Sequence, residues 1–70
     1  MNYKIIDTLK IIDYIDSFSG NVSVDEIILH SGAHKLRVYP ALFELEHSGF
    51  LEVVKTEELG APSVVRKKKQ

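Results

Sequence analysis

Apolar residues recur every three or four positions through the first quarter of the chain. This spacing places them on one face of an amphipathic helix, which we expect to span residues 3–18. The polar residues between them should face water. The expected core positions are Ile5, Leu9, Ile12 and Ile15, and the expected water-facing positions are Asp7, Lys10, Asp13 and Ser17.

Further apolar residues widen the hydrophobic arc of this helix beyond a single stripe. An arc this wide indicates burial on two sides, either within the domain or against a second subunit. The pattern therefore predicts a homodimer as one outcome and tighter packing within the domain as the other. The residues that widen the arc are Ile6, Ile11, Tyr14 and Phe18.

A second helix is expected from residue 24 to about residue 31. Ser19-Gly20-Asn21 breaks the first helix, and Val22 can form a short strand. Ser23 and Glu26 have the spacing of a capping box, in which the serine hydroxyl accepts from the Glu26 N–H and the glutamate reaches back. Gly32 should close the helix, whose buried candidates are Ile27, Ile28 and Leu29.

The third helix is predicted over about residues 36–48. Its apolar residues Val38, Leu42 and Leu45 share one face. Gly49 follows the last of them, where a left-handed cap favours glycine, and Phe50 can fold back onto the last turn. The short glycine-containing turn before this helix predicts a helix-turn-helix. Pro40 lies near the first turn, where a proline is tolerated better than in a helix interior.

The remainder of the chain predicts a β-hairpin. Residues 51–56 and 63–68 are rich in β-branched residues and read as antiparallel strands. Gly60 permits the positive φ that such a loop often needs, and Pro62 lies where no ladder N–H is required. We therefore expect a single α+β domain over residues 1–70, a winged helix-turn-helix with three helices and a C-terminal hairpin as its wing.

Length and composition narrow the class of protein. The 70 residues contain no cysteine, which excludes disulfides and thiolate metal sites. We see no signal-peptide core and no apolar run long enough to span a membrane, so we expect a cytoplasmic protein. No nucleophile motif, paired carboxylates or phosphate-cradling glycine loop is recognisable, so an enzyme is not expected.

Charge is segregated along the chain. The formal net charge is −1, yet residues 1–62 hold five cations against all ten acids. Residues 63–70 hold Arg66, Lys67, Lys68 and Lys69 with no acid. Such segregation suits a protein that binds phosphate on one face. The alternative is a solvated, partly disordered basic tail over about residues 67–70.

Two segments resemble the PadR-like transcriptional regulators over roughly residues 34–68. The run Tyr39-Pro40-Ala41-Leu42, with Leu45-Glu46, Gly49 and Leu51 after it, resembles the recognition helix of that family. The run Glu57-Glu58-Leu59-Gly60-Ala61-Pro62 looks like its wing turn. The resemblance implies a winged-helix DNA-binding regulator. Three positions depart from the family pattern: Val64 and Val65 replace wing tyrosines, and Glu44 replaces a residue that is often basic.

Double-stranded DNA is accordingly the expected partner. The start of the third helix would enter the major groove, where Lys35 and Arg37 would meet phosphate or guanine. Tyr39 either donates its hydroxyl to phosphate or packs against the second helix. Basic residues of the last strand would add phosphate contacts. The remaining candidate DNA-binding residues are Phe43 and His47 on the third helix and Arg66, Lys67 and Lys68 near the end of the chain.

Two alternatives to DNA binding follow from other residues. The histidines His30, His34 and His47 are the plausible metal ligands besides carboxylates, but Gly32 interrupts the helical spacing of the first two, so neither a metal nor another cofactor is expected. The second is a winged helix used for protein–protein contact or dimerisation, without direct contact to DNA. Glu44 and Glu46 favour it, because they oppose Lys35 and Arg37 on the third helix and leave it nearly neutral.

Overall fold

The chain folds into an α+β domain in which three helices pack against a small sheet. A computed structural model describes residues 3–68, and within this range there are three helices and three strands. The order along the chain agrees with the sequence prediction, and the helix and strand ends differ from it by two residues or fewer. The elements are α1 (Tyr3–Asp16), β1 (Asn21–Ser23), α2 (Val24–His30), α3 (Lys35–Ser48), β2 (Leu51–Thr56) and β3 (Pro62–Lys67).

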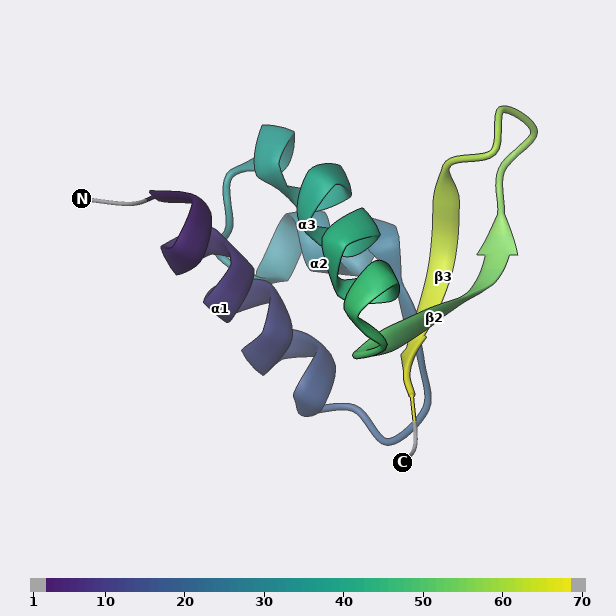
Figure 1. Ribbon diagram of the computed structural model, residues 1–70, viewed down its shortest axis with the longest axis horizontal. Helices are drawn as coiled ribbons and strands as arrows, with labels where there is room; N and C mark the ends of the chain where they lie inside the picture. Colours follow the sequence, from purple (N-terminus) through teal and green to yellow (C-terminus); the bar gives the residue numbers. More distant parts are fainter. Residues whose placement is uncertain (1–2, 69–70) are drawn as a thin grey trace.

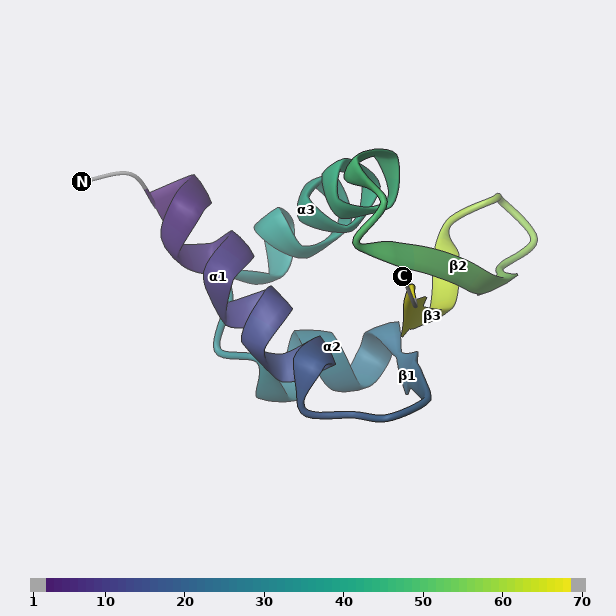
Figure 2. The same ribbon diagram turned by 60° about the horizontal axis from the view of Figure 1, so that its bottom comes forward.

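The sheet is antiparallel with the order β1-β3-β2, so the last strand in sequence lies in the middle. In Figure 2, α3 lies above the interior of the domain, α2 below it, α1 at the left and the sheet at the right. The loop between β2 and β3 projects away from the helices (Figure 1). This arrangement is compatible with a winged-helix-like fold.

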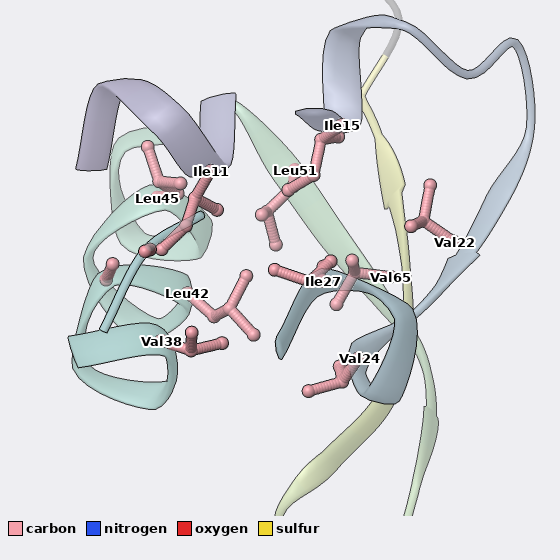
Figure 3. Close-up of a cluster of buried hydrophobic side chains, with 12 residues drawn as sticks. Ile11, Ile15, Val22, Val24, Ile27, Val38, Leu42, Leu45, Leu51 and Val65 are labelled. Atoms are coloured by element: carbon pink, nitrogen blue, oxygen red, sulfur yellow. The ribbon is translucent and has the colours of Figure 1, made fainter. Parts of the chain in front are cut away.

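One hydrophobic core joins the helices to the sheet. Figure 3 shows side chains from all three helices and from the strands directed into a common interior. Val22, Val65 and Val53 form a row across the sheet, since Val65 pairs with both other valines. Val65 is completely buried and Val22 nearly so. The cross-strand row therefore fixes the register of all three strands against the helices.

The end of α3 forms the predicted glycine cap. Gly49 has φ 89° and ψ 9°, the left-handed conformation. Its N–H donates to the carbonyl of Glu46 at 3.1 Å, and the N–H of Phe50 donates to the carbonyl of Leu45 at 3.0 Å. These two bonds define a Schellman motif. The Phe50 side chain packs against the core, so both parts of this prediction are confirmed.

The orientation predicted for α1 is wrong in part. Ile5 and Leu9 were expected in the core, yet they are 55% and 54% exposed. The buried line consists instead of Asp7, Ile11 and Ile15, at a spacing of four residues. Because α1 is apolar on several sides, the spacing fits more than one rotation about the helix axis, and contacts with α3 and α2 select one of them.

The same rotation changes the predicted dimer face. Ile11 is fully buried in the core and cannot meet a second subunit. Tyr14 packs against the core, and its ring contacts that of Phe18 edge to face at a centroid distance of 5.0 Å. Ile6 is half-buried. The exposed apolar residues of α1 are thus Ile5 and Leu9, so the predicted set of contact residues does not form one open face.

Two details of α2 also differ from expectation. Ser23 is the N-cap, but among the described residues its side chain makes no capping hydrogen bond. Glu26 instead approaches Nε2 of His30 at 3.2 Å, one turn along the helix. Leu29, expected to be buried, is 72% exposed. Ile27 is fully buried and Ile28 packs against the core from a half-buried position, as predicted.

The basic end of the chain is more ordered than a tail. Lys67 belongs to β3, and the backbone N–H of Lys68 donates to the carbonyl of Phe50 at 2.9 Å. Residues 67 and 68 of the predicted tail are thus tied to the sheet, and residues 69 and 70 lie outside the described residues. Pro62 opens β3 and is fully buried.

Replacing Gly49 by alanine should lower the free energy of unfolding by about 1 to 2 kcal/mol, because an L-residue is strained in the left-handed region. Gly20→Ala is the matched control, since Gly20 has no φ in that region and no described atom lies within 4 Å of its added Cβ. Urea unfolding followed by circular dichroism measures both variants. Equal midpoints for the two would contradict the role given to the cap.

Candidate nucleic-acid interface

The helix α2, the turn after it and the helix α3 form a helix-turn-helix whose turn is defined by backbone geometry. Gly32 adopts φ 84°, which allows the chain to reverse after α2. His34 is the N-cap of α3, and its Nδ1 accepts a hydrogen bond from the N–H of Leu36 at 3.1 Å. This bond satisfies one of the free donors at the start of the helix.

One side of α3 faces away from the domain. Its buried side consists of Val38, Ala41, Leu42 and Leu45, which pack into the core as predicted. The opposite side carries Leu36, Pro40, Phe43 and His47, all exposed. Leu36 is 75% exposed and Phe43 is 52% exposed. No described element covers this outward face of α3.

Pro40 lies further inside α3 than expected, because the helix begins at Lys35. A proline in this position removes the hydrogen bond to the carbonyl of Leu36, four residues earlier. Pro40 and Leu36 are both exposed, so water can reach this carbonyl. Pro40 therefore lies on the solvent side of α3, where the missing backbone hydrogen bond destabilises the helix least.

The cations predicted to contact DNA at the start of α3 differ in their surroundings. Lys35 is exposed. Arg37 is half-buried, and its Nε is inaccessible to water and has no hydrogen-bond partner among the described residues. Tyr39 is half-buried and packs against the core.

An ion pair changes the balance of charge along α3. Glu44 was expected to repel a nucleic acid, but its Oε1 lies 2.8 Å from Nζ of Lys4 on α1. Both side chains are about half exposed, so this pair contributes little to stability. Its effect is on the surface potential, because the carboxylate charge is offset locally. Glu46 is exposed, and His47 lies at the far end of the same helix.

The basic residues near the end of β3 lie beside the end of α3 and far from its start. Leu51, the first residue of β2, pairs with Lys67, so the end of β3 is beside the end of α3. A helix of 14 residues is about 20 Å long, which separates these cations from Lys35 by roughly that length. Arg66, Lys67 and Lys68 thus form a group at the base of the hairpin rather than at its loop.

Two of these three cations already have acidic partners. The Nε of Arg66 donates to Oε1 of Glu52 at 2.8 Å, directly across the β3–β2 ladder. Lys67 forms an ion pair with Asp16, the last residue of α1, and its Nζ lies 6.0 Å from the centroid of the Phe50 ring. These exposed pairs reduce the charge that the basic group presents to a phosphate.

The hairpin loop itself carries two acidic residues and no cation. The Glu57 N–H donates to the carbonyl of Ala61 at 2.7 Å, and the N–H of Gly60 donates to that of Glu57 at 2.8 Å. Gly60 takes φ 87°, as its predicted role requires. Glu57 and Glu58 are exposed in this loop, and Lys55 is the cation nearest to it in sequence.

Comparisons with known proteins give no relative. No family model matches the chain, and neither the curated proteins nor the solved structures contain a significant match. The resemblance to PadR-like regulators therefore rests on the motif of residues 39–51 and the loop after it.

The part of the chain that the structure describes contains no group of three histidine, cysteine or acidic residues suited to a metal ion. None of the helices within residues 3–68 is long and apolar enough to cross a membrane.

Sequence reasoning missed two residues that lie beside the candidate interface, Lys4 and Asp7. Lys4 was not assigned a role, and its ion pair with Glu44 depends on how α1 crosses α3. Asp7 was expected to face water, yet it is only 8% exposed and lies against the start of α3. The spacing of four residues between Asp7, Ile11 and Ile15 was the available signal that they share a buried line. It was not decisive, because other apolar residues of the same helix also form stripes.

Replacing His34 by alanine should lower the free energy of unfolding by about 1 kcal/mol, because the N–H of Leu36 loses its acceptor. His34→Asn should restore most of this loss, since asparagine is a favourable N-cap residue. Thermal and urea unfolding measure the series, with His47→Ala as the control on the same helix. If alanine and asparagine at position 34 give equal stabilities, the cap is not formed in solution.

Proposed function

We propose that this chain binds double-stranded DNA as a winged helix-turn-helix domain, with α3 in the major groove and the β2–β3 hairpin as the wing. The observation that carries the proposal is the outward face of α3. It is uncovered, and the helix begins with an exposed lysine and a half-buried arginine. In helix-turn-helix proteins the N-terminal residues of the second helix reach base edges.

The distribution of charge around α3 supports this proposal more than a count of the charged residues on α3 does. Glu44 is paired with Lys4, so Glu46 is the remaining acid of α3 that opposes the cations Lys35 and Arg37, and Asp7 of α1 lies beside Arg37. Glu46 is three helical turns from the start of α3. A duplex approaching that start would therefore meet positive potential first.

The cations of the hairpin are not expected to contribute equally to DNA binding. Lys55 is close to the projecting loop and is the best placed cation of the wing. Arg66 and Lys67 are bonded to Glu52 and Asp16, and Lys68 lies beyond them at the base of the hairpin. These three residues would add general attraction to phosphate rather than contacts within the groove.

A second candidate function is protein–protein contact through the same face of α3. The observation that favours it is the pair of exposed apolar side chains on this face, Leu36 and Phe43. Exposed apolar residues that lie together mark interaction sites. Light scattering at high micromolar concentration tests the simplest form of this candidate, self-association: a monomer mass excludes it.

If DNA binds through α3, neutralising a cation at the start of α3 should weaken binding more than neutralising one at the base of the hairpin. Lys35→Gln and Arg37→Gln should each weaken binding to a random-sequence duplex and reduce the slope of log affinity against log salt by about 1. Arg66→Gln is the matched control and should change the slope much less, because Arg66 is bonded to Glu52. Fluorescence anisotropy between about 50 and 200 mM salt measures the slopes.

Circular dichroism must first show that each variant is folded. Equal slopes for the wild type and for both α3 variants would refute contact between the start of α3 and the backbone. A larger effect of Arg66→Gln would move the binding surface to the base of the hairpin.

A further inference from the structure

A pocket of about 460 Å³ lies where α1 meets the turn between α2 and α3. It opens beside the start of α3, next to the outward face described above. Oppositely charged side chains from two helices meet in it, one from α1 and one from α3. The residues that line the pocket are Asp7, Gly32, His34, Leu36 and Arg37.

Asp7 is the acidic member of the pocket. It is 8% exposed, although carboxylates are almost never buried unless they are paired. Within residues 3–68 no hydrogen bond or ion pair to its carboxylate is formed. A carboxylate in this position attracts a cation on the facing helix.

Arg37 contributes the complementary group. Its Nε is inaccessible to water and lacks an acceptor among the described residues, and its side chain lines the same pocket as Asp7. The other cations nearby are engaged or exposed: Nζ of Lys10 donates to the carbonyl of Gly32 at 3.3 Å, and His34 uses Nδ1 for the helix cap. Asp7 and Arg37 thus bring opposite charges to the lining of one pocket.

We propose that Asp7 is a positioning residue for Arg37. Its carboxylate attracts the guanidinium across the pocket, and a side-chain rotation brings the two groups into contact. This attraction holds Nε toward α1 and leaves the terminal N–H groups of Arg37 to point outward. The fixed fork geometry of a guanidinium makes such orientation matter for bidentate recognition. The part of this inference that concerns DNA rests on the proposed function.

The first test needs no DNA. In ¹H–¹⁵N NMR spectra, the Nε–H of Arg37 should give a protected resonance in the wild type and should shift and exchange faster with water in Asp7→Asn. Asp13→Asn, an exposed acid on the same helix, is the matched control, and the Nε–H of Arg66 is the internal reference. An Arg37 resonance that is unchanged by Asp7→Asn overturns the proposal.

If Asp7→Asn does not fold, Arg37→Gln provides a second measurement. The ¹³C shift of the Asp7 carboxyl at fixed pH should differ between wild type and Arg37→Gln, and an equal shift overturns the proposal.

The second test uses a duplex selected by the wild type from a random library. Asp7→Asn should reduce the preference for that duplex over random DNA about fivefold, without weakening binding to random DNA. In the Arg37→Gln background the same substitution should leave the preference unchanged. Coupling seen in the spectra without any DNA binding would retain the role of Asp7 and reject the proposed function. An equal effect of Asp7→Asn in both backgrounds would reject the positioning role.

Discussion

The left-handed turn at Gly49 is the constraint on which the rest of the domain depends. It ends α3 and directs the chain into β2 within two residues, and Leu51, the first residue of that strand, is buried in the core. With so short a connection, the position of α3 fixes that of β2. Since β2 pairs with β3 and β3 with β1, the turn orients the whole sheet relative to the helices.

This geometry also determines where the basic residues lie. Because β3 runs antiparallel to β2, its last residues return to the point where β2 begins, beside the end of α3. Arg66 and Lys67 therefore come within reach of Glu52 and Asp16, and the projecting loop keeps its two acids. The strand pairing separates the cations of β3 from those at the start of α3. The proposed binding of DNA therefore relies on Lys35 and Arg37 more than the distribution of charge along the sequence suggests.

Much of the fold was predictable because local signals agreed with one another. Gly49, the spacing of Val38, Leu42 and Leu45, and the change to β-rich residues after Phe50 each identify the α3–β2 junction. The rotation of α1 was not predictable, because its apolar residues surround most of the helix and only tertiary packing selects Ile11 over Leu9. The ion pairs between elements, such as the one between α1 and α3, were not predictable either. They join residues far apart in sequence, as Lys4 and Glu44 do, and depend on how the helices cross.

The measurement that tests the central proposal most directly is a titration of ¹⁵N-labelled protein with a random-sequence duplex at low salt, followed by ¹H–¹⁵N NMR. If DNA binds through α3, amide signals of the outward face of α3, from Lys35 to His47, and those around Lys55 should shift together as DNA is added. Signals that do not move, or shifts confined to residues 66–68, would contradict binding through α3.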